Sequence, residues 1–358
     1  MSGQGDEARG LLVAGFDGIV CDLDGVVYRG NEAVPHAVES LVSALAAGVG
    51  VVYATNNASR PPDEVSAHLH ELGLTVPTSH VVTSAQAGAH HLARRCAPRA
   101  RVLAVGGPGV SLALQQAGLT PVAVQDASAS GGVEAVLQGY GAQVAWTDLA
   151  EVAYAVQGGA LWVATNVDST LPTERGVAPG NGVLVSAVRA AVRVDPFVVG
   201  KPFTPLYDLS IAVLGTSPDR TLAIGDRLDT DIQGARAAGL ASLFVFGGAH
   251  RWLDVAAASR AARPHYIATD LRVLHSFYAE PSQDADDRSG WLCGQAQARV
   301  AASGDLVVSR TGTLEERLRA ALSALWQAGD VRGATPDPLS GDGAALSDEL
   351  ELALAHRH

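Results

Sequence analysis

Residues 18–25 read GIVCDLDG, a short apolar run that ends on two aspartates and a glycine. Buried parallel strands have this form when they open into a site at their carboxyl ends. A helix is expected next, starting at Pro35 and closing at Gly48, with an apolar stripe between them. A second strand, residues 49–54, then runs into Thr55-Asn56-Asn57. This order predicts a βαβ unit and a doubly wound parallel sheet of the α/β class.

The stretch that follows has its own alternation of helices and strands, with strands expected at residues 101–105 and 132–138. The first pattern resumes at Phe197-Val198-Val199 and continues at residues 220–224, so we expect the chain to leave one sheet and return to it. The predicted parts are a discontinuous core of residues 1–82 and 196–280, an inserted α/β unit of residues 83–195, and a C-terminal extension of residues 281–358.

The C-terminal extension begins with PSQDADD, residues 281–287, a polar stretch typical of a linker. Residues 291–298 and 305–310 are expected to form two strands, and residues 314–326 a helix with an apolar stripe. A broken pattern of this length is marginal as an independent domain. We therefore expect a small α+β piece that packs on the core, with contact to a second subunit or regulation as alternative roles.

The composition restricts the partners of the protein. The 358-residue chain has a formal net charge of −12, whereas nucleic acids and anionic membranes usually bind to a basic face. The N-terminal MSGQGDEARG is polar and acidic, and no apolar run reaches transmembrane length. Three distant cysteines show neither metal-site spacing nor disulfide-scaffold density. We expect a soluble cytoplasmic protein that acts on a small molecule, with self-association left open.

Lys201 is the one lysine among 25 basic residues, the rest of which are arginine. Lysine is a compact ammonium on a slim stem, and it can place a point charge on a phosphate where the wide guanidinium fork does not fit. The exception to the arginine-rich composition therefore indicates a confined anionic site around Lys201.

Four polar clusters each follow an apolar strand, and ligands of open α/β sheets bind at the carboxyl ends of the strands. These clusters are Asp22-Leu23-Asp24-Gly25, Thr55-Asn56-Asn57, Gly200-Lys201-Pro202, and Gly225-Asp226 with Asp229 and Asp231 after it. Converging carboxylates repel each other unless a cation joins them, and an all-oxygen set suits Mg²⁺. With Mg²⁺ and a lysine opposite a phosphoryl group, one aspartate can be a nucleophile and another a general acid and base.

In this order the clusters resemble the motifs of the haloacid dehalogenase-like (HAD) phosphatases, over roughly residues 12–275. The resemblance implies a Rossmann-like core in which Asp22 forms an aspartyl-phosphate. Asp24 would protonate the leaving alkoxide and then activate water. Thr55 and the Asn56 amide would hold phosphoryl oxygens, while Lys201 would neutralise the phosphate and the nucleophile.

The resemblance also implies the binding set. Mg²⁺ would be bound by Asp22, Asp226 and the carbonyl of Asp24, with Asp231 as an orienting carboxylate in the next layer. Asp229 has no such role, and a solvated surface position is expected for it. The implied substrate-binding residues are Gly25, Thr55, Asn56, Asn57 and Lys201.

The position of the inserted stretch indicates which subgroup of the HAD phosphatases the chain resembles. The stretch from Asp24 to Thr55 leaves no room for a helical cap, whereas the stretch from Thr55 to Lys201 accommodates an α/β cap of the C2 type. Together with ATNVD at residues 164–168 and PGNG at residues 179–182, this is similar to the class IIA, NagD-like and nitrophenylphosphatase-like group. With the C-terminal extension, the chain most resembles the bacterial glycerol-3-phosphate phosphatases of that class.

The implied activity is Mg²⁺-dependent hydrolysis of a small phosphate ester, with glycerol 3-phosphate first and pyridoxal 5′-phosphate, 2-phosphoglycolate and nucleotide monophosphates as alternatives. The sequence departs from the group at residues 140–143, YGAQ, where a charged pair is common, and this leaves the cap contacts to the substrate open. A non-catalytic ligand-binding protein that has kept the fold is the other class of hypothesis.

Overall fold

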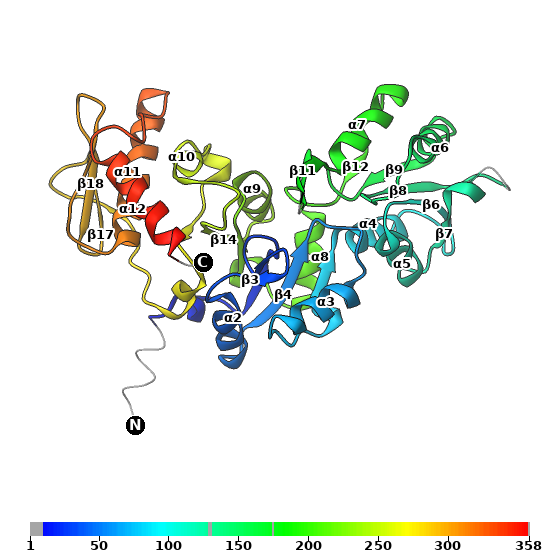
Figure 1. Ribbon diagram of the computed structural model, residues 1–358, viewed down its shortest axis with the longest axis horizontal. Coiled ribbons are helices and arrows are strands. Elements are labelled where there is room, and N and C mark those ends of the chain that lie inside the picture. Colours follow the sequence, from blue (N-terminus) through cyan, green and yellow to red (C-terminus); the bar gives the residue numbers. More distant parts are fainter. Residues whose placement is uncertain (1–9, 128–130, 174, 357–358) are drawn as a thin grey trace. The chain divides into compact units, whose positions relative to one another are not determined.

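The computed structural model describes residues 10–127, 131–173 and 175–356 (Figure 1). Its largest sheet has six strands, and the neighbouring pairs β4–β5, β13–β14 and β14–β15 are parallel. In sheet order these strands are β15 (Tyr266–Ala268), β14 (Ala241–Val245), β13 (Thr221–Gly225), β1 (Gly18–Cys21), β4 (Gly50–Thr55) and β5 (Val81–Thr83). The doubly wound parallel sheet expected from the sequence is confirmed.

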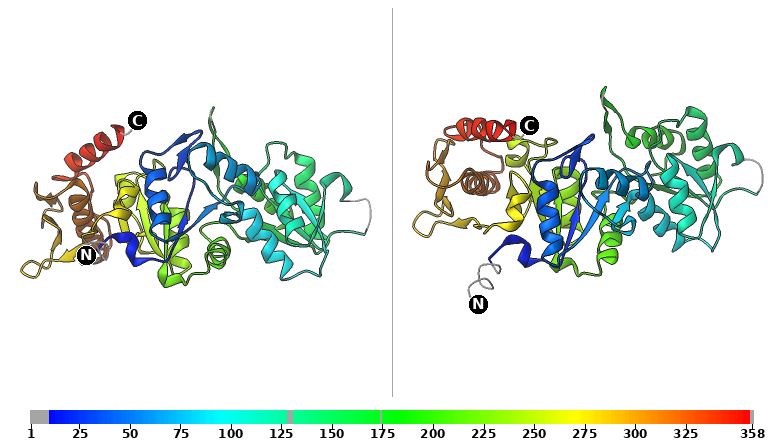
Figure 2. Two further views of the ribbon diagram at one scale, coloured as in Figure 1. Left: turned by 90° about the horizontal axis from the view of Figure 1, so that it is seen from below. Right: turned by 60° about the horizontal axis from the view of Figure 1, so that its bottom comes forward.

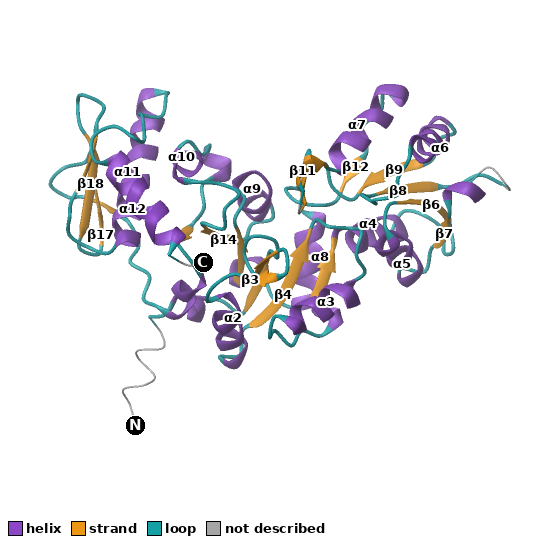
Figure 3. Ribbon diagram, viewed as in Figure 1, coloured by secondary structure: helices purple, strands orange, loops and turns teal. Residues whose placement is uncertain are grey.

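The strands of this sheet are short and apolar, and β1 and β13 are buried along their whole length. Helices line the sheet (Figure 3). Those from the same stretches of the chain are α2 (Ala37–Ala46), α3 (Pro62–Glu71), α8 (Pro205–Leu214), α9 (Gln233–Ala237) and α10 (Trp252–Ala256). A hairpin of β2 (Tyr28–Arg29) and β3 (Glu32–Ala33) follows β1, and a single irregular turn of helix, η5 (Leu228–Ile232), follows β13.

A second parallel sheet is built from the stretch between the two halves of the first. Its strands are, in sheet order, β12 (Phe197–Val198), β9 (Leu161–Ala164), β8 (Ala135–Gln138), β6 (Arg101–Val105) and β7 (Thr120–Val122). Its helices are α4 (Ser84–Ala93), α5 (Pro108–Gln116), α6 (Trp146–Gln157) and α7 (Asn181–Val192), and β10 (Thr170–Thr173) pairs with β11 (Gly176–Pro179) in a hairpin. The second α/β sheet predicted for the inserted stretch is therefore present.

One strand was predicted in the wrong sheet. Phe197 and Val198 pair with Val163 and Ala164 at the edge of the second sheet, and they do not return to the first. Phe197 is 45% exposed, as an edge position allows and a central strand would not. A two-residue apolar run carries no information about its partner strand, so the sequence pattern could not choose between the sheets.

The C-terminal extension folds as a four-stranded antiparallel sheet with two helices. The sheet has the order β16 (Ser282–Gln283), β17 (Gly290–Cys293), β18 (Ala296–Val300) and β19 (Leu306–Val308), and α11 (Leu314–Arg332) lies along it, followed by α12 (Gly343–Ala355) (Figure 2). Two expectations were wrong here. The supposed linker contains β16, and the single strand expected at residues 291–298 is a hairpin, because Gly294 and Gln295 form a two-residue turn.

The extension shares one buried apolar cluster with elements of the core. Leu318, Leu322 and Leu346 of the extension belong to the same cluster as Phe244 of β14 and Trp252 of α10. The expected packing of the extension on the core is confirmed by this cluster.

Contacts divide the chain into two compact units, built mainly from Gly25–Gly50 with Asp219–His358 and from Val51–Pro218. The domain limits expected from the sequence remain a prediction. Among the residues that the structure describes, no helix combines the length and hydropathy needed to cross a membrane.

Candidate active site

Lys201 and Asp22 form an ion pair in the second unit. Asp22 directly follows β1, and the Nζ atom of Lys201 donates a hydrogen bond to its Oδ1 atom. The side chain of Lys201 is only 4% exposed and that of Asp22 13%, so little water screens the pair. The confined anionic surroundings expected for the sole lysine are present, with Asp22 as the anion.

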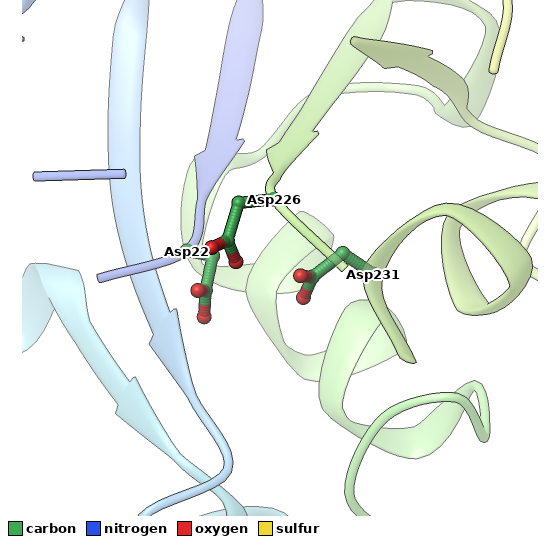
Figure 4. Close-up of side chains that lie close together, drawn as sticks. All are labelled: Asp22, Asp226 and Asp231. Atoms are coloured by element: carbon green, nitrogen blue, oxygen red, sulfur yellow. The ribbon is translucent and has the colours of Figure 1, made fainter. Parts of the chain in front are cut away.

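Three carboxylates gather at one point, as Figure 4 shows. Asp22, Asp226 and Asp231 each offer one oxygen atom, and these atoms lie within 4.8 Å of one another. Asp226 and Asp231 are both 3% exposed, so their negative charges are poorly hydrated. Like charges at this separation need a cation, and three hard oxygen donors fit Mg²⁺. The sequence predicted Asp22 and Asp226 as metal ligands, and the cluster contains both.

Asp231 and Gly25 complete the surroundings of Asp226. The Oδ2 atom of Asp231 accepts the backbone N–H of Arg227 at 3.1 Å, which fixes this carboxylate on the turn after β13. Gly25 has a φ of +86°, and a Cβ atom there would lie 2.2 Å from Oδ2 of Asp226. Any other residue at position 25 would push the Asp226 carboxylate away.

The loop after β4 is held by its own side chains. Thr55 is 4% exposed, and its Oγ1 atom accepts the backbone N–H of Asn57 at 3.0 Å. The Oδ1 atom of Asn57 in turn accepts the N–H and the hydroxyl of Ser59, at 3.0 and 2.7 Å. The Oδ1 atom of Asn57 therefore shapes the loop, and the binding role predicted for this residue remains a prediction.

Asn56 is held by contacts that the sequence did not reveal. Its side chain bonds the backbone of Lys201 on both sides and also the carboxylate of Asp168, a residue of the segment after β9. Asp168 was noticed only as part of the ATNVD motif. The available signal was its position, since Thr165-Asn166-Val167-Asp168 follows β9 much as Thr55-Asn56-Asn57 ends β4.

Asp24 differs from Asp22 in its surroundings. Its side chain reaches solvent, yet the protein packed around it removes hydration and raises its pKa, while the nearby charges of Lys201, Arg60 and His68 act in the opposite direction. A raised pKa keeps a carboxyl group protonated to higher pH, which is what a general acid requires. Asp229, in contrast, pairs with Arg227 at 2.9 Å on the exposed side of its turn, where the sequence had placed it.

Comparison with known proteins agrees with this arrangement. Residues 19–120 match the family model of haloacid dehalogenase-like hydrolases, and residues 198–274 match a second HAD-hydrolase-like model. The chain is 44% identical, over 87% of its length and 86% of the relative, to the D-glycerol 3-phosphate phosphatase of Mycobacterium tuberculosis. It is 33% identical, over 65% of its length and 88% of the relative, to the 5′-nucleotidase YutF of Bacillus subtilis.

A solved structure extends the match to three dimensions. The glycerol phosphate phosphatase of Mycobacterium tuberculosis in complex with magnesium superposes with a TM-score of 0.78 at 42% identity, covering 89% of this chain and 92% of that one. The resemblance proposed from the motifs is thereby confirmed, and the chain belongs to the haloacid dehalogenase-like hydrolases.

Proposed function

We propose that this protein is a Mg²⁺-dependent phosphatase that hydrolyses glycerol 3-phosphate to glycerol and inorganic phosphate. The observation that carries the proposal is the ion pair between Lys201 and Asp22 beside the carboxylates of Asp226 and Asp231. The relative with 44% identity acts on D-glycerol 3-phosphate by its name, and its match covers 87% of this chain, whereas the match of the 5′-nucleotidase covers 65%.

In the first half of the reaction, a carboxylate oxygen of Asp22 attacks the phosphorus atom and the bond to the glycerol oxygen breaks. The Asp24 carboxyl group gives its proton to that leaving oxygen, so glycerol departs as the neutral alcohol. The ammonium of Lys201, already bonded to Asp22, balances the charge of the phosphoryl group. A magnesium ion bound by Asp22 and Asp226 would supply further positive charge at the phosphoryl oxygens.

In the second half, the Asp24 carboxylate takes a proton from water, and the water oxygen attacks the phosphorus atom of the aspartyl-phosphate. The bond between Asp22 and phosphorus breaks, which restores the carboxylate and releases inorganic phosphate. The buried hydroxyl of Thr55 lies at the end of β4, where it would donate to a phosphoryl oxygen.

We also propose that residues 83–195 act as a cap that selects the substrate alcohol, that the site set predicted from the motifs performs the chemistry, and that the protein works in the cytoplasm. The separate parallel sheet of the inserted stretch supports the first part of this proposal.

The test is release of inorganic phosphate, with and without Mg²⁺, from a panel of small esters. The panel contains both enantiomers of glycerol 3-phosphate, pyridoxal 5′-phosphate, 2-phosphoglycolate and, because of the 5′-nucleotidase relative, nucleoside monophosphates. Metal-dependent release with a preference for glycerol phosphate supports the proposal. Preference for another ester would overturn the substrate, and no release from any ester would favour a binding protein.

A further inference from the structure

The side chain of Asn56 forms hydrogen bonds with both the backbone N–H and the backbone carbonyl oxygen of Lys201. The N–H of Lys201 donates to Oδ1 of Asn56 at 2.7 Å, and Nδ2 of Asn56 donates to the carbonyl oxygen of Lys201 at 3.0 Å. The two residues are 145 positions apart in the sequence. A side-chain amide that pairs with a peptide in this way fixes both the position and the orientation of the Lys201 backbone.

Asn56 is itself held in place by hydrogen bonds to its backbone carbonyl oxygen. Its carbonyl oxygen accepts the hydroxyl of Ser84 and the side-chain amide of Asn166, both at 2.7 Å. Asn166 is held in turn, since its carbonyl oxygen accepts Nδ2 of Asn181 at 2.8 Å. Ser84, Asn166 and Asn181 are all buried, so these bonds are shielded from water. Asn56 is therefore a rigid support for Lys201.

The carboxylate of Asp168 accepts the second hydrogen of the Asn56 side-chain amide. The Nδ2 atom lies 3.2 and 3.3 Å from the two carboxylate oxygens of Asp168, and an amide nitrogen has two hydrogens to give. One hydrogen serves Lys201 and the other serves Asp168. A carboxylate acceptor also fixes which end of the Asn56 amide carries the nitrogen. The side chain of Asn56 is thus committed to protein partners, and the phosphoryl contact predicted for the Asn56 amide is left to its backbone N–H.

The segment before the lysine is fitted to this contact. A Cβ atom on Gly200 would lie 2.7 Å from Oδ1 of Asn56 and 2.4 Å from the carbonyl oxygen of Thr165. The backbone of residue 200 can therefore approach Asn56 only because it has no side chain. This close approach is what brings the N–H of Lys201 within reach of the amide.

We propose that Asn56 is a positioning residue that holds Lys201 against Asp22, and that Asp168 orients the Asn56 amide for this task. The reason is the length of the lysine stem: four flexible carbons place the ammonium reliably only when the backbone that carries them is fixed. The proposal rests on the proposed phosphatase function, because Lys201 matters there as the cation beside the nucleophile.

The sole lysine allows a direct test. Growth with [¹⁵N]lysine labels one backbone amide in the untagged chain, so an N–H correlation spectrum contains a single peak from the group that donates to Asn56. The variants are Asn56→Ala, which removes both bonds, Asn56→Asp, which keeps only the acceptor, and Asp168→Ala. Asn31→Asp, in an exposed turn, is the matched control. Hydrogen exchange of the labelled amide and kcat/KM for glycerol 3-phosphate are measured on each folded variant.

We expect exchange of the Lys201 amide to be at least about tenfold faster in Asn56→Ala, because a protecting bond is lost. We expect kcat/KM to fall about 100-fold in Asn56→Ala and Asn56→Asp, mainly through kcat, as for a misplacement of about 1 Å in an active site. Asp168→Ala should lower kcat/KM about tenfold, the lower limit for loss of an orienting partner. Asn31→Asp should match the wild type in both measurements.

The results separate this proposal from the proposed function. A wild type that releases no phosphate refutes the function, while the amide exchange still shows whether Asn56 holds Lys201. Unchanged exchange in Asn56→Ala, or kcat/KM within about threefold of the wild type in both Asn56 variants, overturns the positioning role. If Asp168→Ala changes neither measurement, the part assigned to Asp168 is wrong.

Discussion

Replacement of Gly25 by alanine should damage the metal site although no metal ligand is replaced. The new Cβ atom would lie 2.2 Å from Oδ2 and 2.7 Å from Cγ of Asp226. Normal contact requires these atoms to separate by about 1 Å more. The carboxylate of Asp226 must therefore move relative to Asp22 and Asp231. A displacement of that size lowers the reaction rate at a preorganised site by about 100-fold.

Backbone strain must be separated from this displacement, and Gly30→Ala provides the control. Gly25 has a φ of +86° and Gly30 a φ of +60°, so alanine is strained at both positions by about 1–2 kcal/mol. A Cβ atom on Gly30 has no atom within 4 Å, so this variant carries the strain without the collision. Both variants should lose similar stability, and only Gly25→Ala should lose the metal.

The assay is calorimetric titration of Mg²⁺ into each variant, together with phosphate release as a function of Mg²⁺ concentration. We expect the Kd for Mg²⁺ to rise about 100-fold in Gly25→Ala and to stay within about threefold of the wild type in Gly30→Ala. If the two variants bind Mg²⁺ equally well, the close approach of residue 25 to Asp226 does not control the metal site, and the reasoning from the collision is refuted.

Three further predictions concern the nucleophile, the extension and pH. Asp22→Asn should abolish phosphate release while the circular dichroism spectrum stays native, and retained turnover would contradict the nucleophile assignment. Arg319→Leu should lower the free energy of unfolding by about 1–3 kcal/mol, because it removes the buried hydrogen bond to the carbonyl of Ile267 at 3.0 Å. Urea denaturation should show a much smaller loss of unfolding free energy for Arg299→Leu, because Arg299 is exposed. Equal losses in the two variants would argue against the role of the buried bond. The pKa of His91 is lowered to about 4, first by burial and then by nearby arginines. In the unfolded chain His91 has a pKa of about 6.5. Between about pH 6.5 and 4 the unfolded chain therefore binds a proton at His91 that the folded chain does not bind, so the free energy of unfolding should fall as the pH drops through this range. His91→Leu should make that fall shallower in urea denaturation, and an unchanged slope would exclude His91 as a contributor.

The strands that carry the site could be predicted because their sequence is unambiguous. The runs that form β1, β4 and β13 are apolar and end on polar residues, a pattern that few other structures produce. Asp22 and Asp226 could be placed together from the general position of ligands in such sheets. The carboxylates of the proposed metal site and the sole lysine could therefore be identified from the sequence alone.

The rest depended on tertiary contacts that leave no local signal. Phe197 and Val198 were given to the wrong sheet because a two-residue run does not identify its partner. The role of Asn56 was hidden because the amide bonds the backbone of Lys201, and backbone groups are the same in every residue. Asp168 was hidden for a similar reason, since a carboxylate that accepts one amide hydrogen has no required spacing.

The apolar cluster shared by the core and the extension has a consequence for synthesis of the chain. Phe244, Trp252 and Val255 leave the ribosome well before Leu318 and Leu346, which belong to the same cluster. Because the chain emerges from its N-terminus, the catalytic half presents this uncovered apolar face while the last helices are still being made. Translational pausing before α11, or messages truncated there, should therefore yield nascent chains that recruit chaperones and aggregate when chaperones are scarce.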